Sequence, residues 1–425
     1  MTPRDPEAYL DSLEPIGWKL GLERMRKLSA VLGLPQHRFA SIHVVGTNGK
    51  SSVTRMVAAL LETHRVPAGA CVSPHAARWS ERILVHGVEI GPAELSAAVE
   101  RAALAAETVN RTLGEGEAVT QFELATAAAF VALANARVKA AVVEAGLGGR
   151  LDATNTIPSR VTVLTSVGLD HTEWLGESEE EIAAEKLAVL RDHTTLVLGR
   201  VSPAVRELAE RIAAERRARL VVAEEDPGPE IELRAPGGFQ RRNFALACAA
   251  AEAFLGELDP ARVACVATSI EIPGRLEQVG TDPSVFLDAA HNPDGAKALA
   301  EALPEVAEGR PVIAVIAVLA DKDANAMIEA LAPTLTQAIC TELPSADGPI
   351  GPVGLDLSAR RRAFPARELT RLCVDAGFAA EAEPDFEAAI SRGRVLAREA
   401  GGALLVTGSH YALAPARAAL GLCED

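Results

Sequence analysis

Aromatic residues and clustered cysteines are both scarce in this sequence. Aromatic side chains make up only 4% of the 425 residues, so Ala, Leu and Val must fill most of the hydrophobic cores. No C-x-x-C pair occurs, which argues against a zinc cluster or a thioredoxin-like redox pair. The six cysteines are widely spaced, at Cys71, Cys248, Cys265, Cys340, Cys373 and Cys423. We therefore expect reduced thiols and a cytoplasmic protein.

The sequence also lacks segments suited to a membrane and an excess of positive charge. No run approaches the roughly 18 apolar residues of a membrane span, and the opening MTPRDPEAYL has no apolar signal-peptide core. Lys and Arg number 42 against 58 Asp and Glu, which gives a net charge of −16. This balance argues against a nucleic acid as the main partner, because such binding depends on neutralising phosphates. The negative net charge is still compatible with a nucleotide that is held by one loop and a metal.

Apolar runs alternate with helical patterns and predict an α/β fold. The length predicts about two to three domains, and 48% hydrophobic and 24% charged residues are typical of globular proteins. Helical patterns occupy Ser51–Thr63 and Glu123–Asn135. The alternation predicts a mostly parallel sheet with helices on both faces. Short buried strands are predicted at 41–45, 139–146, 161–168, 194–199 and 220–225.

A second, shorter series of predicted strands follows residue 280. The Pro273-Gly274 pair is a turn signal and marks the predicted boundary. We expect a P-loop ATPase-like domain at 1–272 and a smaller Rossmann-like α/β domain at 273–425. The stretch Ser345–Pro365 is rich in Gly and Pro and then basic, so we expect a surface loop there.

The segment HVVGTNGKSSV, residues 43–53, places a glycine turn between a predicted strand and a predicted helix. The full signature Gly-x-x-x-x-Gly-Lys-Ser/Thr is not met, because Val44 stands where its first glycine belongs. Backbone N–H groups and the helix N-terminus could still bind phosphates. Lys50 would place a charge on the outer phosphates, and Ser51 or Ser52 could reach phosphate or metal. The glycines alone are equally compatible with a simple strand-to-helix turn.

Candidate site residues follow other predicted strands. Glu144 ends one strand, and Asp170 and His171 follow the next. Ligands of α/β sheets bind at the carboxyl ends of strands, so we expect both strand ends to lie side by side and form a metal-nucleotide site. The alternatives are a solvated glutamate and a capping histidine. Lys186 lies in an apolar helical pattern, where a lone lysine usually extends to the surface.

Two further segments are less specific. Ser73 and His75 flank a proline in a predicted loop that enters a hairpin. Asp288, His291 and Asn292 lie between a predicted strand and a predicted helix, where an N-cap is the alternative to a binding site.

Together these segments resemble the folylpolyglutamate synthase and dihydrofolate synthase family of the Mur ligase superfamily. The pair GLGGRLDATN and GLDHTE is highly specific, whereas the glycine loop is common to all Mur ligases. The matching segments occur in family order over nearly the whole chain: GLERM (21–25), HVVGTNGKSS, SPH, ER, GLGGRLDATN, GLDHTEWLG, EK (185–186), PGRLE (273–277), DAAHNP, VLADKD (318–323) and VTGSHY (406–411).

Two positions depart from the family pattern. The family loop usually reads Gly-Thr-Asn-Gly-Lys-Gly-Ser, and here Ser51 replaces the glycine after Lys50. Other Mur ligases carry Ser or Thr there, so phosphate binding should persist, while the roles of the two hydroxyls stay open. The stretch 345–362 is also longer than the family leads us to expect.

The resemblance implies an ATP-dependent ligase that adds L-glutamate to a folate through an acyl phosphate, and it leaves open whether dihydropteroate is also a substrate. It implies two Mg²⁺ ions, with Ser73 and Glu144 at one and His171 at the other, and a carbamylated Lys186. It implies catalytic roles for Lys50, Lys186 and His291. The implied ATP-binding residues are Thr47, Asn48, Gly49, Lys50, Ser51, Ser52, Asn243, Arg275 and Asp288. The implied pterin-side residues are Thr120, Gln121, Phe122, Glu123, Leu151, Asp152 and Ala153.

Other functions fit the sequence less well. Another Mur-type amino-acid ligase should lack GLGGRLDATN, and a nucleotide-binding regulator would not need Glu144, His171, Lys186 and Asp288 together. A nicotinamide-dependent dehydrogenase is excluded because no G-x-G-x-x-G follows the first predicted strand. We expect a monomer that binds small-molecule substrates and neither nucleic acid nor membrane.

Overall fold

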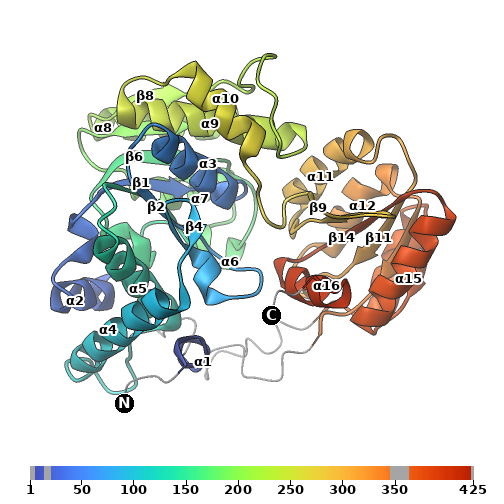
Figure 1. Ribbon diagram of the computed structural model, residues 1–425, viewed down its shortest axis with the longest axis horizontal. Helices are drawn as coiled ribbons and strands as arrows, with labels where there is room; N and C mark the ends of the chain where they lie inside the picture. Colours follow the sequence, from blue (N-terminus) through green and yellow to red (C-terminus); the bar gives the residue numbers. More distant parts are fainter. Residues whose placement is uncertain (1–4, 14–20, 345–362, 423–425) are drawn as a thin grey trace. The chain divides into compact units, whose positions relative to one another are not determined.

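The computed structural model describes residues 5–13, 21–344 and 363–422. These residues form two compact units (Figure 1). The first unit contains the described chain up to Leu233 together with Arg241–Ile270. The second contains Arg234–Gln240 and the described chain from Glu271.

The first unit is built on an eight-stranded sheet in the order β4-β3-β2-β5-β1-β6-β7-β8. The neighbours from β2 to β8 are parallel, while β3 and β4 are antiparallel to their neighbours. The predicted α/β class with a mostly parallel sheet is therefore confirmed. The strands are β1 Ala40–Val45, β2 Ala68–Cys71, β3 Ile83–Val85, β4 Val88–Glu89, β5 Ala140–Glu144, β6 Ser159–Leu164, β7 Thr195–Leu198 and β8 Arg219–Val222.

Helices of the first unit pack on this sheet through small apolar residues. One core cluster joins β5 to the Ala-rich helices α4 and α5, and another joins β1, β6 and β7 to α7 and α8. The helices are α1 Pro6–Asp11, α2 Glu23–Val31, α3 Lys50–Thr63, α4 Pro92–Asn110, α5 Gln121–Asn135, α6 Thr172–Leu175, α7 Glu179–Leu187, α8 Pro203–Glu215, α9 Gly238–Leu255 and α10 Pro260–Ser269. Short 3-10 turns are η1 Pro35–His37, η2 Trp79–Arg82 and η3 Ala153–Thr156.

The strand predicted at 220–225 is present as β8, but the prediction that it is buried is wrong. β8 lies at the edge of the sheet, where it pairs only with β7, and Val222 is exposed. An edge strand has a neighbour on one side only, so its apolar side chains are covered less than those of a central strand.

The second unit contains a six-stranded sheet in the order β13-β12-β11-β14-β10-β9, in which only β9 runs antiparallel to its neighbour. Its strands are β9 Glu277–Thr281, β10 Ser284–Leu287, β11 Val312–Ile316, β12 Gln337–Cys340, β13 Ala379–Ala382 and β14 Ala403–Thr407. Its helices are α11 Pro293–Val306, α12 Ala324–Leu331, α14 Ala366–Asp375, α15 Phe386–Glu399 and α16 Leu413–Ala419, with short turns η4 Ala332–Thr334 and η5 His410–Ala412. Most of the predicted surface loop, residues 345–362, lies outside the described residues.

None of the helices in the described ranges combines the length and the apolar character that crossing a membrane requires.

Candidate functional site

The glycine loop connects the carboxyl end of β1 to the start of α3, in the middle of the first unit's sheet (Figure 1). Gly46 has φ 152°, and a Cβ there would collide with the hydroxyl of Thr165. Gly49 is the N-cap of α3 with φ 84°, and its Cβ would lie 2.6 Å from Oδ1 of Asn243. Only glycine fits both the backbone conformation and the space at these positions.

Hydrogen bonds fix this loop to the segment that follows β6. The N–H of Thr47 donates to the carbonyl of Ser166 (2.8 Å), and the N–H of Asn48 donates to the Ser166 hydroxyl (3.0 Å). The Thr165 hydroxyl donates to the carbonyl of Asn48 (2.7 Å). The first N–H groups of α3 have no acceptor within the helix, and its N-terminus carries partial positive charge. The loop is therefore a preformed site for phosphate oxygens.

Two lysines reach the same loop. The Lys50 ammonium donates to the carbonyl of Thr47 (3.0 Å), and Lys186, on α7, donates to the carbonyl of Gly46 (2.9 Å). Lys186 is only 3% exposed, so the alternative of a lysine that extends to the surface does not hold. Burial and then repulsion by Lys50 lower the pKa of Lys186 to about 7, although nearby carboxylates, Asp170 first, oppose the shift. An amine with this pKa is largely uncharged above neutral pH.

Glu144 is the buried carboxylate of this site, with 3% of the residue exposed. It ends β5 beside Val44 of β1, so it lies at the edge of the sheet that carries the loop. Its Oε1 accepts a hydrogen bond from the Ser51 hydroxyl (2.9 Å), and its Oε2 accepts one from the N–H of Ser73 (3.0 Å). Glu144 also lines a mainly apolar cavity of about 30 Å³. Ser51, Ser73 and Glu144 are thus brought together.

His171 does not lie directly beside Glu144 in the sheet. The expected neighbouring strand ends are separated, because β1 lies between β5 and β6. His171 precedes α6 in the left-handed conformation (φ 52°), its side chain is 43% exposed, and its Nε2 is 3.8 Å from the Asp170 carboxylate. The described residues contain no group of three or more His, Cys, Asp or Glu side chains placed to hold a metal.

The donor set around Glu144 nevertheless suits Mg²⁺. That ion prefers oxygen ligands and is usually held by one or two carboxylates together with phosphate oxygens and water. Glu144 and the Ser51 hydroxyl, 2.9 Å apart beside a phosphate loop, match this chemistry. His171 offers nitrogen, which Mg²⁺ takes less readily, while the adjacent Asp170 offers oxygen.

Among the residues expected on the pterin side, Phe122 lines the apolar cavity. Its neighbours Thr120 and Glu123 form the capping box of α5: the Thr120 hydroxyl accepts from the Glu123 N–H (3.2 Å), and Glu123 accepts from the Thr120 N–H (2.9 Å). Glu123 also forms a buried ion pair with Arg24 (3.0 Å). The Gln121 amide donates to the carbonyl of Leu10 (2.9 Å). Thr120, Gln121 and Glu123 thus hold the helix that presents Phe122.

The second expected pterin segment is held by Asp152. This buried carboxylate accepts from the N–H of Leu147 and the N–H of Thr154, each at 2.9 Å, and burial raises its pKa. Leu151 is exposed and Ala153 is buried. Asp152 fixes the glycine-containing turn that follows Glu144.

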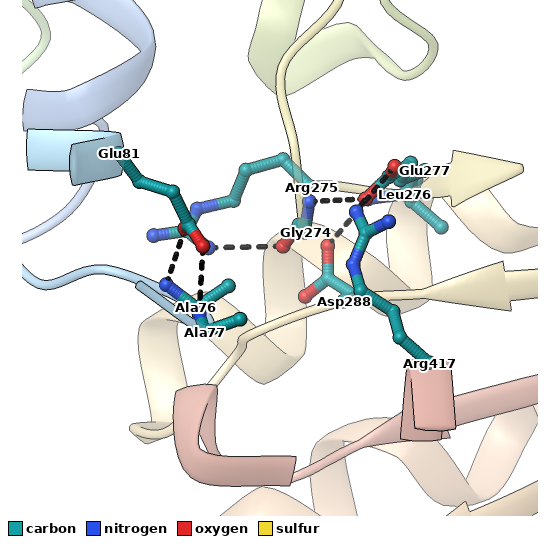
Figure 2. Close-up of polar contacts among 9 residues, drawn as sticks. All are labelled: Ala76, Ala77, Glu81, Gly274, Arg275, Leu276, Glu277, Asp288 and Arg417. Atoms are coloured by element: carbon teal, nitrogen blue, oxygen red, sulfur yellow. Dashed lines mark hydrogen bonds and ion pairs between the residues drawn. The ribbon is translucent and has the colours of Figure 1, made fainter. Parts of the chain in front are cut away.

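A cluster that includes the cavity-lining residues Trp79 and Arg82 was missed as a functional unit. Arg82 donates to Nδ1 of His75 (2.8 Å) and stacks over Trp79, with its guanidinium carbon 4.1 Å from the ring centroid. Burial and then Arg82 lower the pKa of His75 to about 3, so its ring is neutral. Glu81 accepts from the N–H groups of Ala76 and Ala77, as Figure 2 shows. The motifs SPH and ER contain His75, Glu81 and Arg82, but Trp79 lies between the motifs, and their spacing does not reveal the stacking.

In the second unit, Asp288 shapes the loop that carries Arg275. Its buried carboxylate accepts from the N–H of Leu276 at 2.8 Å, as Figure 2 shows. It also accepts from the N–H of Ala290 at 2.8 Å. Burial raises the pKa of Asp288, and the charge of Arg275 opposes this effect. Arg275 itself donates to the carbonyl of Gly274 (2.9 Å).

His291 follows the same loop. Its Nδ1 is 2.9 Å from the carbonyl of Ala289, and its ring meets His410 edge to face, with centroids 6.0 Å apart. Asn292 is the N-cap of α11 and accepts from the N–H of Gly295 (2.8 Å). The N-cap alternative is therefore correct for Asn292, while His291 projects from the cap into a small aromatic cluster.

Comparisons with known proteins identify this architecture. The Mur ligase middle domain matches residues 44–228, and the Mur ligase glutamate ligase domain matches residues 274–410. Together these matches define the chain as a Mur ligase. Among curated proteins, a dihydrofolate synthase/folylpolyglutamate synthase of Mycobacterium tuberculosis is 37% identical over 360 residues, covering 75% of this chain and 74% of that protein. One of Bacillus subtilis is 33% identical over 364 residues, covering 79% and 84%.

Comparison with solved structures leads to the same family. Mycobacterium tuberculosis folylpolyglutamate synthase complexed with ADP and AMPPCP has a TM-score of 0.86 at 31% identity, covering 96% of both chains. A bifunctional enzyme of Yersinia pestis complexed with AMPPNP and a Mn ion has a TM-score of 0.81 at 28% identity, covering 98% of this chain and 97% of that one. The chain therefore belongs to the folylpolyglutamate synthase/dihydrofolate synthase family. The family predicted from the sequence motifs is confirmed, and the alternative of another Mur-type ligase is not supported.

Proposed function

We propose that this protein is an ATP-dependent ligase that joins L-glutamate to a folate. The observation that carries the proposal is the position of Glu144, which lies between a preformed phosphate loop and an apolar cavity. The apolar lining of this cavity beside the loop matches the chemistry of a substrate with a flat apolar body and a carboxylate at its reactive end. The names of the relatives, folylpolyglutamate synthase and dihydrofolate synthase, support the same reaction.

The proposed reaction has two steps. An oxygen of the folate carboxylate attacks the γ-phosphorus of ATP, ADP leaves, and an acyl phosphate forms. The amine of L-glutamate then attacks the acyl carbonyl, the amine loses a proton, and phosphate departs with the former carboxylate oxygen. Phosphoryl transfer depends mainly on positioning and charge stabilisation. Lys50 and the N-terminus of α3 supply positive charge to the transferring group.

Thr47 to Ser52 would hold the phosphates of ATP, and Asn243, against Gly49, would contact the nucleotide. Glu144 and Ser73 would hold a first Mg²⁺, with the Ser51 hydroxyl beside them, and His171 would hold a second. Bound Mg²⁺ neutralises phosphate charge. The Mn ion and AMPPNP in the Yersinia pestis enzyme support a divalent metal with the nucleotide.

Lys186 would carry a carbamate. Its pKa of about 7 leaves much of the amine unprotonated near neutral pH. An unprotonated amine attacks CO₂, a nitrogen–carbon bond forms, and loss of one proton leaves a carbamate anion. This change would replace a buried cation, which Lys50 repels, by a group that Lys50 attracts. Enzyme equilibrated with ¹³C-bicarbonate should show a carbamate carbon resonance that Lys186→Ala lacks.

The remaining assignments are parts of the same proposal. Residues 1–272 would bind ATP and the pterin body, with Phe122 against the ring, and residues 273–425 would form the glutamate-ligase domain. Arg275 and Asp288 would serve the nucleotide and His291 the reaction. We also propose a cytoplasmic monomer.

Release of ADP tests this function, measured with L-glutamate and each of two acceptors, a reduced folate and dihydropteroate. We expect ADP release with the reduced folate that requires L-glutamate. Dihydropteroate is the second candidate acceptor, supported by the E. coli relative solved in complex with DHPP and ADP. The reaction without L-glutamate is the control. The proposal would be refuted if neither acceptor gave ADP release that depends on L-glutamate.

A further inference from the structure

A polar cavity of the first unit lies away from the glycine loop. It has a volume of about 250 Å³ and is lined by residues of α2, η1 and η3 and by Arg191. η1 precedes β1, and Arg191 precedes β7, so the cavity lies at the amino ends of these strands. The glycine loop and Glu144 lie at the carboxyl ends. Because β1 has six residues, the two edges are separated by roughly 20 Å.

Positive charge dominates this cavity. Arg26 and Arg191 both line it, together with His37, and no Asp or Glu is among its lining residues in the described chain. Arg26 lowers the pKa of Arg191, although burial contributes more, and Arg216 adds to the effect. Two like charges that face one space without a counter-charge repel each other. This arrangement stands out in a protein with a net charge of −16.

Arg191 is held in place by neutral acceptors. Its Nη2 donates to the carbonyl and to Oδ1 of Asn155, both at 2.7 Å, and to the carbonyl of Ile157 at 3.3 Å. These bonds fix the guanidinium and leave its Nε and Nη1 without an acceptor among the residues that the structure describes. Arg216, which also lowers the pKa of Arg191, differs from these two arginines because it pairs with Asp192 (3.1 Å). The remaining N–H donors of Arg191 and the N–H donors of Arg26 are thus available to a ligand.

Two buried side chains of the cavity wall each have a polar atom without a partner among the described residues. Ser29 is 1% exposed and Gln36 is 2% exposed, and both line the cavity. The hydroxyl of Ser29 and Oε1 of Gln36 have no hydrogen-bond partner within the described chain. Of the two, only the Ser29 hydroxyl can donate to an anion, because an amide oxygen is an acceptor. An unpaired buried polar group destabilises the folded chain, so such groups usually bind a ligand or water. Ser29 lies three residues after Arg26, which places both on one face of α2.

We propose that this cavity binds a phosphate group, with Arg26 and Arg191 as the charged donors and Ser29 as a hydroxyl donor. Two guanidinium groups match a phosphate dianion in charge, and planar guanidinium forks match its oxygens in geometry. The volume exceeds the need of a bare phosphate ion, so the group could arrive as inorganic phosphate or on a small phosphate ester. The site is distinct from the loop that would hold ATP.

Isothermal titration calorimetry with inorganic phosphate tests the proposal, using the full chain with and without ADP and Mg²⁺. We compare Arg26→Gln with Lys27→Gln, a matched control on the same helix. Lys27 forms only an exposed pair with Glu23 (2.9 Å) and does not line the cavity. We expect at least tenfold weaker phosphate binding in Arg26→Gln and less than a twofold change in Lys27→Gln. Ser29→Ala should weaken binding severalfold without lowering stability.

The comparison separates this site from the glycine loop. Binding that ADP removes and that Arg26→Gln leaves unchanged would belong to the loop and would overturn the proposal, as would equal effects of Arg26→Gln and Lys27→Gln. Weaker phosphate binding in Arg26→Gln would support the proposed site even if the protein did not bind ADP. A parallel titration with glycerol 2-phosphate identifies the source: tighter binding than inorganic phosphate favours an ester, and equal binding favours the free ion.

Discussion

The buried Lys186 makes a prediction about stability that can be worked from the structure. Its Nζ donates to the carbonyl of Gly46, and burial lowers its pKa from 10.5 to about 7. Below pH 7 the folded and unfolded chains both carry the charge, and the folded chain bears the cost of burying it. Between pH 7 and about 10.5 the unfolded chain alone keeps the proton, so the free energy of unfolding should rise with pH.

The magnitude follows from the width of this interval. One pH unit corresponds to about 1.4 kcal/mol for one proton. Because the folded chain is only half deprotonated at pH 7, the step from pH 7 to pH 9 should stabilise the wild-type protein by about 2 kcal/mol. Lys186→Met keeps a long apolar side chain and removes the titration. The difference between wild type and Lys186→Met isolates Lys186, because other titrating groups occur in both proteins.

Urea unfolding at pH 6, 7, 8 and 9 measures this difference, with fluorescence of the tryptophans as the signal and CO₂ excluded from the buffer. We expect Lys186→Met to be the more stable protein at pH 6 and to lose that advantage by pH 9. Added bicarbonate should stabilise only the wild type if a carbamate forms. A difference that stays constant from pH 6 to pH 9 would refute the depressed pKa of Lys186 and with it the basis of the carbamate proposal.

Four further substitutions test the loop and its carboxylate. Glu144→Gln should lower kcat by at least 100-fold with an unchanged circular dichroism spectrum, because a neutral amide cannot offset metal charge; near-normal turnover in a folded variant would contradict this role. Ser51→Gly loses one hydrogen bond, worth about 0.5–1.5 kcal/mol, and should raise the KM for ATP tenfold or less, whereas Lys50→Ala should reduce kcat far more; equal damage in steady-state assays would make Ser51 a direct metal ligand. Gly46→Ala should destabilise the protein by more than about 2 kcal/mol in urea unfolding, because its Cβ would collide with Thr165; an unchanged midpoint would show that the loop can relax.

The fold was predictable wherever local pattern and burial agreed. The apolar runs that became β1, β5, β6 and β7 each contain β-branched residues, and each was expected as a strand. β2, with the sequence AGAC, and β13, with AAEA, lack β-branched residues and were not expected. Tertiary pairing imposes the strand conformation on such segments, because strand preference depends on neighbours more than on the residues themselves.

The site was predictable as a set of residues but not as a set of contacts. The motifs identified Lys50, Glu144 and Lys186, yet the apolar helix around Lys186 suggested a surface lysine, because its partner at Gly46 lies 140 positions away. The link between Ser51 and Glu144 spans 93 positions. Such contacts depend on which strands are neighbours, and the position of β1 between β5 and β6 could not be read from their order along the chain.

Transfer of oxygen from the folate to phosphate tests the central claim most directly. The reduced folate is labelled with ¹⁸O in its carboxylate and incubated with the enzyme, ATP and L-glutamate, and the released phosphate is examined by mass spectrometry. Ligation through an acyl phosphate predicts one ¹⁸O atom in each phosphate formed, together with a folate lengthened by one glutamate. Unlabelled phosphate accompanying the lengthened folate, or labelled phosphate without glutamate addition, would contradict the account.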